Sequence, residues 1–158
     1  MTSNLRVATR ADLEAVKEIV RAAYTAYIAR IGREPGPMLD DYGALIDAGH
    51  VHVAERDGAV QGILVLIPQE EAMLLDNVAV APQAQGVGLG RQMLEFAEHA
   101  TIKAGYHTIK LYTNEKMTEN LSLYSRIGYT ETHRVEERGL RRVYMSKTLG
   151  EWRTGMTL

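Results

Sequence analysis

Cysteine is absent from the 158 residues of this chain. Its absence excludes disulfide bonds, thiolate metal sites and covalent catalysis through a cysteine. An excess of one charge is also missing, because 18 lysines and arginines stand against 20 acidic residues, for a formal net charge of −2. A protein that binds nucleic acid strongly usually carries a basic excess. We therefore expect no nucleic-acid partner.

Long hydrophobic runs are absent as well. No apolar run approaches the roughly 20 residues that a membrane-spanning helix needs, and the first residues lack the apolar centre of a signal peptide. We therefore expect a cytoplasmic protein that does not enter a membrane. Its length suits a single domain over residues 1–158. An enzyme or a binding protein is the default expectation.

Local signals along the chain predict a mixed α/β fold. Thr9 and Asp12 fit a capping box that starts a helix, and Asp57-Gly58 predicts a tight hairpin. The order β-α-α-β-β-β-α-β-α-β-β indicates a mixed sheet with helices on both faces. Strands are expected at 5–9, 50–56, 59–67, 72–80, 107–113, 129–135 and 141–149, and helices after Thr9 and at 39–48, 88–104 and 117–126.

The stretch 76–91, "DNVAVAPQAQGVGLGR", joins an apolar strand to a helix through Gly86, Gly88 and Gly90. A glycine turn before a helix N-terminus presents unpaired N–H groups, which suit phosphate. The dinucleotide pattern G-x-G-x-x-G fails by one residue because Arg91 takes its last position. The P-loop pattern fails because the chain contains no Gly-Lys pair.

What remains is Gln83-x-x-Gly86-x-Gly88, which resembles motif A of the GCN5-related N-acetyltransferases (the GNAT superfamily). The setting agrees, because the motif follows the strand residues "VAV" at 78–80 and precedes a long helix. Downstream, "LYSRIGY" at 123–129 resembles motif B of the same superfamily.

The resemblance covers about residues 5 to 148. It implies a mixed, mostly antiparallel and twisted sheet of about seven strands flanked by about four helices, splayed between strands 4 and 5. It also implies acetyl-CoA as co-substrate, with no metal. The cofactor contacts implied by position are Val78, Ala79, Val80, Gln85, Gly86, Val87, Gly88, Leu89, Gly90 and Arg91. The bland alternative for 78–80 is a core strand, and both interpretations can hold together.

Without a cysteine, the simplest route is direct attack of an amine on the thioester. The amine must lose a proton, the carbonyl oxygen needs a donor, and a strand N–H near Val78 or Ala79 can serve. Tyr124 matches the motif B tyrosine and is the expected general acid, since a phenol stays protonated at neutral pH; otherwise it is a packed aromatic. Asp76 is the expected base, with Glu70, Glu71 or a water chain as alternatives.

The chain departs from motif B at two positions, where Met117 and Asn120 replace an expected asparagine and an expected small residue. Asn114 or Asn120 is expected to supply the missing amide contact to the cofactor. The alternative for either is a helix cap or a turn.

The first two helices and their connection are expected to line the acceptor pocket, although a solvated loop is the alternative. The predicted contacts are Tyr27, Arg30, Arg33, Met38 and Asp41, and Tyr24, Glu34, Asp40 and Tyr42 are further candidates. Paired acids at 40–41 would attract a cationic amine. The five histidines show no metal-binding spacing.

We predict an acetyl-CoA-dependent N-acetyltransferase that acts on a primary amine of a small molecule, peptide or protein. The alternative from another class is a non-catalytic acyl-CoA-binding module of the same fold. Another acyl donor or a hydroxyl acceptor also stays open. Edge strands near the C-terminus are compatible with a homodimer.

Overall fold

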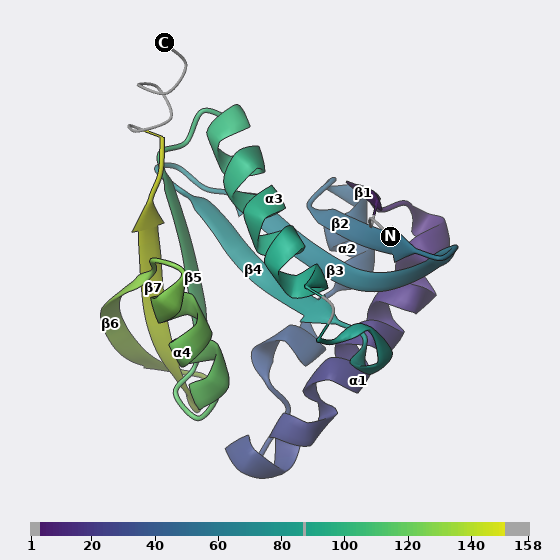
Figure 1. Ribbon diagram of the computed structural model, residues 1–158. Helices are drawn as coiled ribbons and strands as arrows, with labels where there is room; N and C mark the ends of the chain where they lie inside the picture. The colour runs from purple at the N-terminus through teal and green to yellow at the C-terminus, as the bar shows by residue number, and fades with distance from the viewer. Residues whose placement is uncertain (1–3, 87, 151–158) are drawn as a thin grey trace. The chain divides into compact units, whose positions relative to one another are not determined.

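The computed structural model describes residues 4–86 and 88–150 (Figure 1). The chain divides into two compact units. One contains the residues up to Ile67 together with Asp76–Ala97, and the other contains Pro68–Leu75 together with the residues from Glu98 onward. The backbone therefore passes between the units three times. A single domain over 1–158 stays a prediction.

The strands form a seven-stranded mixed sheet in the hydrogen-bonded order β1-β2-β3-β4-β5-β7-β6. The pair β4/β5 is parallel, with the register Met73↔Ile109 to Leu75↔Leu111, whereas β1/β2, β2/β3, β5/β7 and β6/β7 are antiparallel. The strands are β1 Asn4–Val7, β2 Val51–Arg56, β3 Ala59–Pro68, β4 Met73–Val80, β5 Thr108–Asn114, β6 Thr130–Glu137 and β7 Leu140–Thr148. This sheet and four α-helices confirm the predicted fold class, while the splay between β4 and β5 stays a prediction.

In the first unit, helices cover both faces of the sheet. Asn77 of β4 contacts Tyr24 of α1 (Leu13–Ile31). Val80 lies on the opposite face, since its Cγ2 is 3.8 Å from where a Cβ on Gly90 of α3 (Leu89–Lys103) would stand. Residues three apart on a strand point to opposite faces. The helices thus pack on opposite sides of β4.

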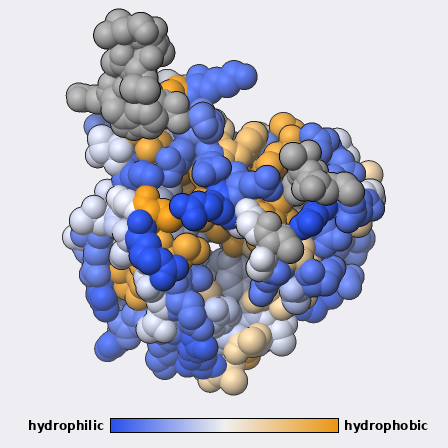
Figure 2. Space-filling model, in the orientation of Figure 1, coloured by the Kyte–Doolittle hydropathy of each residue, from blue (hydrophilic) through white to orange (hydrophobic). Residues whose placement is uncertain are grey.

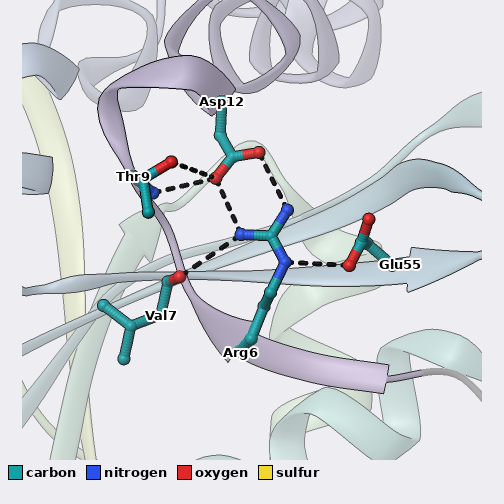
Figure 3. A network of polar contacts seen from close by, with 5 residues as sticks. All are labelled: Arg6, Val7, Thr9, Asp12 and Glu55. Atoms are coloured by element: carbon teal, nitrogen blue, oxygen red, sulfur yellow. Dashed lines mark hydrogen bonds and ion pairs between the residues drawn. The ribbon is translucent and has the colours of Figure 1, made fainter.

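The chain enters α1 through the predicted capping box (Figure 3). The Asp12 carboxylate accepts a hydrogen bond from Thr9 N at 2.8 Å and two from the Arg6 guanidinium, at 2.8 and 2.9 Å. Arg6 Nε also donates to Glu55 of β2 at 2.8 Å. The Arg6 hydrogen bond is the largest influence holding the pKa of Asp12 down, to about 2. Asp12 therefore stays charged although it is only 8% exposed.

Asp12→Asn is expected to lower the free energy of unfolding near pH 7 by about 2 kcal/mol. The carboxylate's pKa is lower in the folded chain than in the unfolded chain, so its contribution is present above about pH 4 and is lost as the pH falls toward 2. Urea unfolding from pH 2 to pH 7 measures both effects. The variant should show the flatter pH dependence.

Asp47→Asn is the matched control for this substitution. Asp47 also pairs with an arginine, Arg10, at 2.8 Å, but both side chains are more than half exposed. Exposed pairs contribute about 0–1 kcal/mol, so the control should change stability little. Equal losses in the two variants would contradict the role assigned to Asp12.

The second helix is shorter than predicted. A 3₁₀ turn spans Gly36–Leu39, and α2 begins only at Tyr42 and ends at Asp47. The Asp41 side chain accepts a hydrogen bond from Ala44 N at 3.1 Å, as an N-cap residue does. The paired acids therefore start the helix instead of lying within it.

The second compact unit contains the pairs β5/β7 and β7/β6 and the helix α4 (Thr118–Arg126). Arg138 and Gly139 both have positive φ, 53° and 78°, at the turn between β6 and β7. They form a tight hairpin like Asp57-Gly58, whose φ values are 56° and 79°. The buried core of the second unit is apolar apart from Thr101 and Thr113 and includes Ile109, Leu111, Val143 and Met145.

The molecular face drawn in Figure 2 is largely hydrophilic, with apolar side chains in scattered patches. Large exposed apolar residues lie apart in the sequence, at Val7, Leu39, Leu123 and Val135. Single exposed apolar residues are normal on a protein surface. Across residues 4–86 and 88–150, no helix combines the length and the apolar character that crossing a bilayer requires.

Candidate active site

The final part of β4, residues 76–80, has one edge bonded to β3 and one directed away from it. Ala81 N, just beyond the strand, donates to the carbonyl of Gln61 at 2.8 Å. Backbone groups of successive strand residues point to opposite edges, so those of Val80 and Val78 point away from β3. This edge can pair with the amide groups of an extended ligand.

The backbone groups of Ala79 point toward β3. Its carbonyl oxygen is 3.4 Å from the position that a Cβ on Gly62 of β3 would take. Among the predicted strand contacts, the residues whose backbone groups are directed to the outer edge are therefore Val78 and Val80. Of Val78 and Ala79, the two residues predicted to offer an N–H to the thioester oxygen, Val78 directs its N–H to this edge.

The turn after β4 exposes its backbone between two buried anchors. Gly86 and Gly88 have φ values of 84° and 85°, a conformation that glycine adopts readily. A Cβ at either position would meet nothing within 4 Å, so crowding by the protein does not explain the glycines. Ala84 and Leu89, both buried, hold the two ends of the turn.

The first turn of α3 supplies the other half of this site. Its leading N–H groups have no acceptor within the helix, and the helix dipole makes this end positive. Gly90 is half-buried near Val80, and Arg91 is exposed. Gln85 Nε2 reaches the Val80 carbonyl at 3.3 Å. Val87, also predicted to bind the cofactor, lies outside the described residues.

Tyr124 lies in the second compact unit, on α4, and is 7% exposed. Its ring packs edge-on against the ring of Tyr129, with centroids 5.6 Å apart. Burial raises the pKa of the Tyr124 phenol to about 12, because removal from water disfavours the tyrosinate. The side chain is thus a neutral proton donor at ordinary pH, as a general acid must be.

The end of α4 is fastened by a lysine from β7. Lys147 Nζ donates to the Ile127 carbonyl at 2.8 Å and pairs with Glu98 of α3 at 2.8 Å. A Cβ on Gly128 would lie 3.1 Å from the Lys147 side chain. These contacts hold the helix that carries Tyr124, and no local sequence pattern predicts them.

The two asparagines predicted to bind the cofactor have different surroundings. Asn114, at the end of β5, accepts a hydrogen bond from Lys116 N at 2.9 Å through its side chain, which is a turn arrangement. Asn120 is half-buried on α4. The local bond at Asn114 supports the alternative turn role, and cofactor binding by either residue stays a prediction.

The base candidates also fall into different units. Asp76 is half-buried on β4, and its backbone shares the outer edge with Val78 because the two are two residues apart. Glu70 and Glu71 are exposed in the segment before β4, in the other unit. Position along the strand therefore favours Asp76.

The predicted acceptor contacts cluster on α1 and the segment after it. Tyr27 is half-buried, and the Arg30 guanidinium lies over its ring, 4.9 Å from the centroid. Arg33 is exposed and Met38 is half-buried. Asp41 caps α2, so part of its hydrogen-bonding capacity is used within the fold. All five belong to the first compact unit.

Asn77 is a buried polar residue that was not among those predicted from the sequence. It is 4% exposed and lies between Tyr24 and Tyr42. Its only sequence signal was a polar residue inside an apolar strand. In the part of the chain that the structure describes, no group of three or more His, Cys, Asp or Glu side chains is arranged to hold a metal ion.

The strand edge, the glycine turn and the helix N-terminus define a protein that can bind an extended, phosphorylated ligand with amide groups. Residues 47–131 match the family model described as the acetyltransferase (GNAT) domain. The chain therefore belongs to the GNAT superfamily, which confirms the predicted resemblance.

Curated relatives carry acetyltransferase names. The chain is 29% identical over 89 residues to a 5-NmdU N-acetyltransferase of Pseudomonas phage PaMx11, across 55% of this chain and 61% of the phage protein. It is 34% identical over 86 residues to a mycothiol acetyltransferase of Streptomyces griseus subsp. griseus, across 53% of this chain and 28% of that protein. The chain thus spans less than two thirds of either relative.

Solved structures agree with the fold. The acetyltransferase yncA of Salmonella typhimurium, solved with its cofactor acetyl-CoA, superposes with a TM-score of 0.70 at 21% identity, covering 96% of both chains. At this identity the likeness establishes the fold.

Proposed function

We propose that this chain is an acetyl-CoA-dependent N-acetyltransferase that acetylates a primary amine of a small molecule, a peptide or a protein. Acetyl-CoA supplies an acetyl group on a thioester, whose C–S bond breaks as the C–N bond of the amide forms. The observation that carries the proposal is the outer edge at Val78 and Val80, followed at once by the exposed glycine turn and the N-terminus of α3. The family's acetyltransferase description supports it.

The residues present fit such a ligand. Pantetheine contains two amides, whose carbonyl oxygens suit the backbone N–H groups of Val78 and Val80. Its diphosphate suits the N–H groups of the glycine turn and the first turn of α3. Arg91, exposed on that turn, adds a positive charge.

Each chemical task has a residue of this chain assigned to it. Asp76, directly or through water, takes the proton that the ammonium must lose before its nitrogen can attack. The N–H of Val78 donates to the carbonyl oxygen as negative charge develops there. Tyr124 gives its phenolic proton to the departing sulfur. The nitrogen loses its second proton to solvent as the amide forms, and Tyr124 regains one from solvent. With no cysteine to carry the acetyl group, direct transfer is the simplest route.

Calorimetry with CoA and acetyl-CoA, followed by a thiol-release assay against a panel of amines, tests the proposal. Because the chain has no cysteine, a thiol reagent reports only the CoA that is released. We expect binding in the ordinary range of enzyme substrates, about 1 μM to 1 mM, and turnover with at least one amine.

Each outcome of the screen has a definite meaning. Failure to bind CoA would overturn the proposal. Binding without turnover on any amine would favour a non-catalytic acyl-CoA-binding module, and turnover only with alcohols would assign an O-acetyltransferase. A homodimer and a cytoplasmic location stay predictions.

A further inference from the structure

Three buried polar side chains, Tyr24, Tyr42 and Asn77, form a hydrogen-bonded cluster that we call the tyrosine–asparagine cluster. Tyr24 Oη donates to Asn77 Oδ1 at 2.5 Å, and Asn77 Nδ2 donates to Tyr42 Oη at 2.9 Å. Tyr42 Oη in turn donates to the Pro37 carbonyl at 2.5 Å. The three residues are 4–9% exposed and all belong to the first compact unit. The cluster ties α1, α2 and the segment before α2 to β4.

Stability alone does not require a polar cluster at this place. Replacing both partners of a buried hydrogen bond with apolar groups of similar shape can leave stability nearly unchanged. A satisfied polar network, in contrast, restrains the orientation of each member. The question is therefore which group the cluster orients.

The cluster extends to the outer edge of β4 through Tyr24. Besides its bond to Asn77, the Tyr24 hydroxyl lies 3.4 Å from the Val78 carbonyl oxygen. The N–H and the carbonyl of one strand residue point to the same edge. Tyr24 therefore reaches the edge that carries the Val78 N–H. Its one hydroxyl proton is donated to Asn77, the residue before Val78, and its contact with the Val78 carbonyl at 3.4 Å is a weaker, shared one.

We propose that Tyr24 is a positioning residue for acetyl transfer, which holds the backbone of Val78 so that its N–H meets the oxygen that becomes negative. The inference rests on the proposed function. It also explains the use of the edge. Tyr24 lies against the Val78 carbonyl and Gln85 Nε2 against the Val80 carbonyl, which leaves the N–H groups of Val78 and Val80 for the ligand. A misplacement of about 1 Å in such a site can cost about 10²-fold in rate.

Tyr24→Phe tests the inference because it removes the hydroxyl and keeps the ring. We expect kcat to fall about tenfold, less than the roughly 10²–10³-fold that loss of a whole oxyanion donor costs. The CoA dissociation constant should stay within about twofold and the shape of the pH profile should not change, because Tyr24 transfers no proton. Tyr42→Phe, one hydrogen bond further from Val78, should have a smaller effect on kcat.

Tyr106→Phe is the matched control. Its hydroxyl donates to the Gln69 carbonyl at 2.6 Å, in the other compact unit. The control should keep kcat, and thermal unfolding of all three variants separates loss of stability from loss of rate. A Tyr24→Phe enzyme with full kcat, or one whose kcat loss is matched by Tyr106→Phe, would overturn the inference.

The amide NMR shift of Val78 gives a second readout that needs no turnover. In the wild-type chain, acetyl-CoA should move this shift more than CoA does, because only the thioester offers the carbonyl oxygen. In Tyr24→Phe the difference should shrink. Wild-type binding of CoA with equal shifts from both ligands would overturn the inference and leave cofactor binding intact, whereas no binding at all would overturn the proposed function and the inference together.

Discussion

Tyr124→Phe is expected to lower kcat about 100-fold, within the range typical of general acid catalysis, and to leave CoA affinity within about twofold. The substitution removes the proton that the departing sulfur would receive while the ring stays in its packing. Steady-state kinetics with the amine found in the screen, together with calorimetry, measures the two quantities separately. A loss of CoA affinity equal to the loss of kcat would point to a packing role instead.

Tyr129→Phe is a closely matched control for this variant. Tyr129 is buried beside Tyr124, and its hydroxyl has no hydrogen-bond partner among the described residues. Burial, with the nearby Glu98 charge, raises the pKa of Tyr129, so it stays neutral. Removing this hydroxyl leaves no partner unsatisfied, and kcat should stay close to the wild-type value.

The pH profile adds an independent check on Tyr124. Because burial raises the pKa of the phenol to about 12, the acid keeps its proton throughout the range in which the amine loses its own. The wild-type kcat should therefore rise with pH as the amine deprotonates. At pH values up to about 11, ionisation of Tyr124 should cause no decrease in kcat. A descending limb near pH 10 that disappears in Tyr124→Phe would show that the phenol is not shielded as its burial indicates.

Gly88→Asn is expected to weaken CoA binding about tenfold while changing the melting temperature little. Asparagine tolerates the left-handed backbone that Gly88 adopts, and a Cβ there meets no protein atom within 4 Å. The side chain would instead occupy the space through which phosphate approaches the N–H groups. Losing one charge-assisted hydrogen bond costs about 1.5–3 kcal/mol, which is tenfold or more in affinity.

Gly58→Asn is the control for the backbone effect. Gly58 has nearly the same φ, 79° against 85°, and equally open space around a Cβ, but lies in the hairpin between β2 and β3. Its substitution should leave CoA affinity unchanged. If Gly88→Asn also binds CoA normally, the glycine serves the turn and not a ligand.

Local chemistry made much of the fold predictable. The Thr9–Asp12 capping box, the Asp57-Gly58 hairpin and the glycine turn before α3 each depend on residues a few positions apart. The error at the second helix had the same local origin, because Asp41 acts as an N-cap and delays the start of α2 to Tyr42. The hydrogen bond between the Asn114 side chain and Lys116 N is also a local contact, between residues two positions apart.

The site could be predicted only in part. The backbone stretch that would hold the cofactor is continuous in sequence, so its motif was visible. The tyrosine–asparagine cluster was not, since Tyr24 and Tyr42 lie 53 and 35 residues from Asn77. The same is true of the Lys147–Glu98 pair that holds α4, whose members are 49 residues apart.

The order of residues was enough to settle the superfamily, the kinds of elements and the glycine turn, because caps, turns and strand alternation arise from neighbours along the chain. Which edge of β4 is open, which N–H can face a ligand and what Tyr24 touches were settled only when distant segments packed together. The reason is physical: a buried hydroxyl or amide must find its partner in space, and nothing in its immediate sequence says which partner that will be.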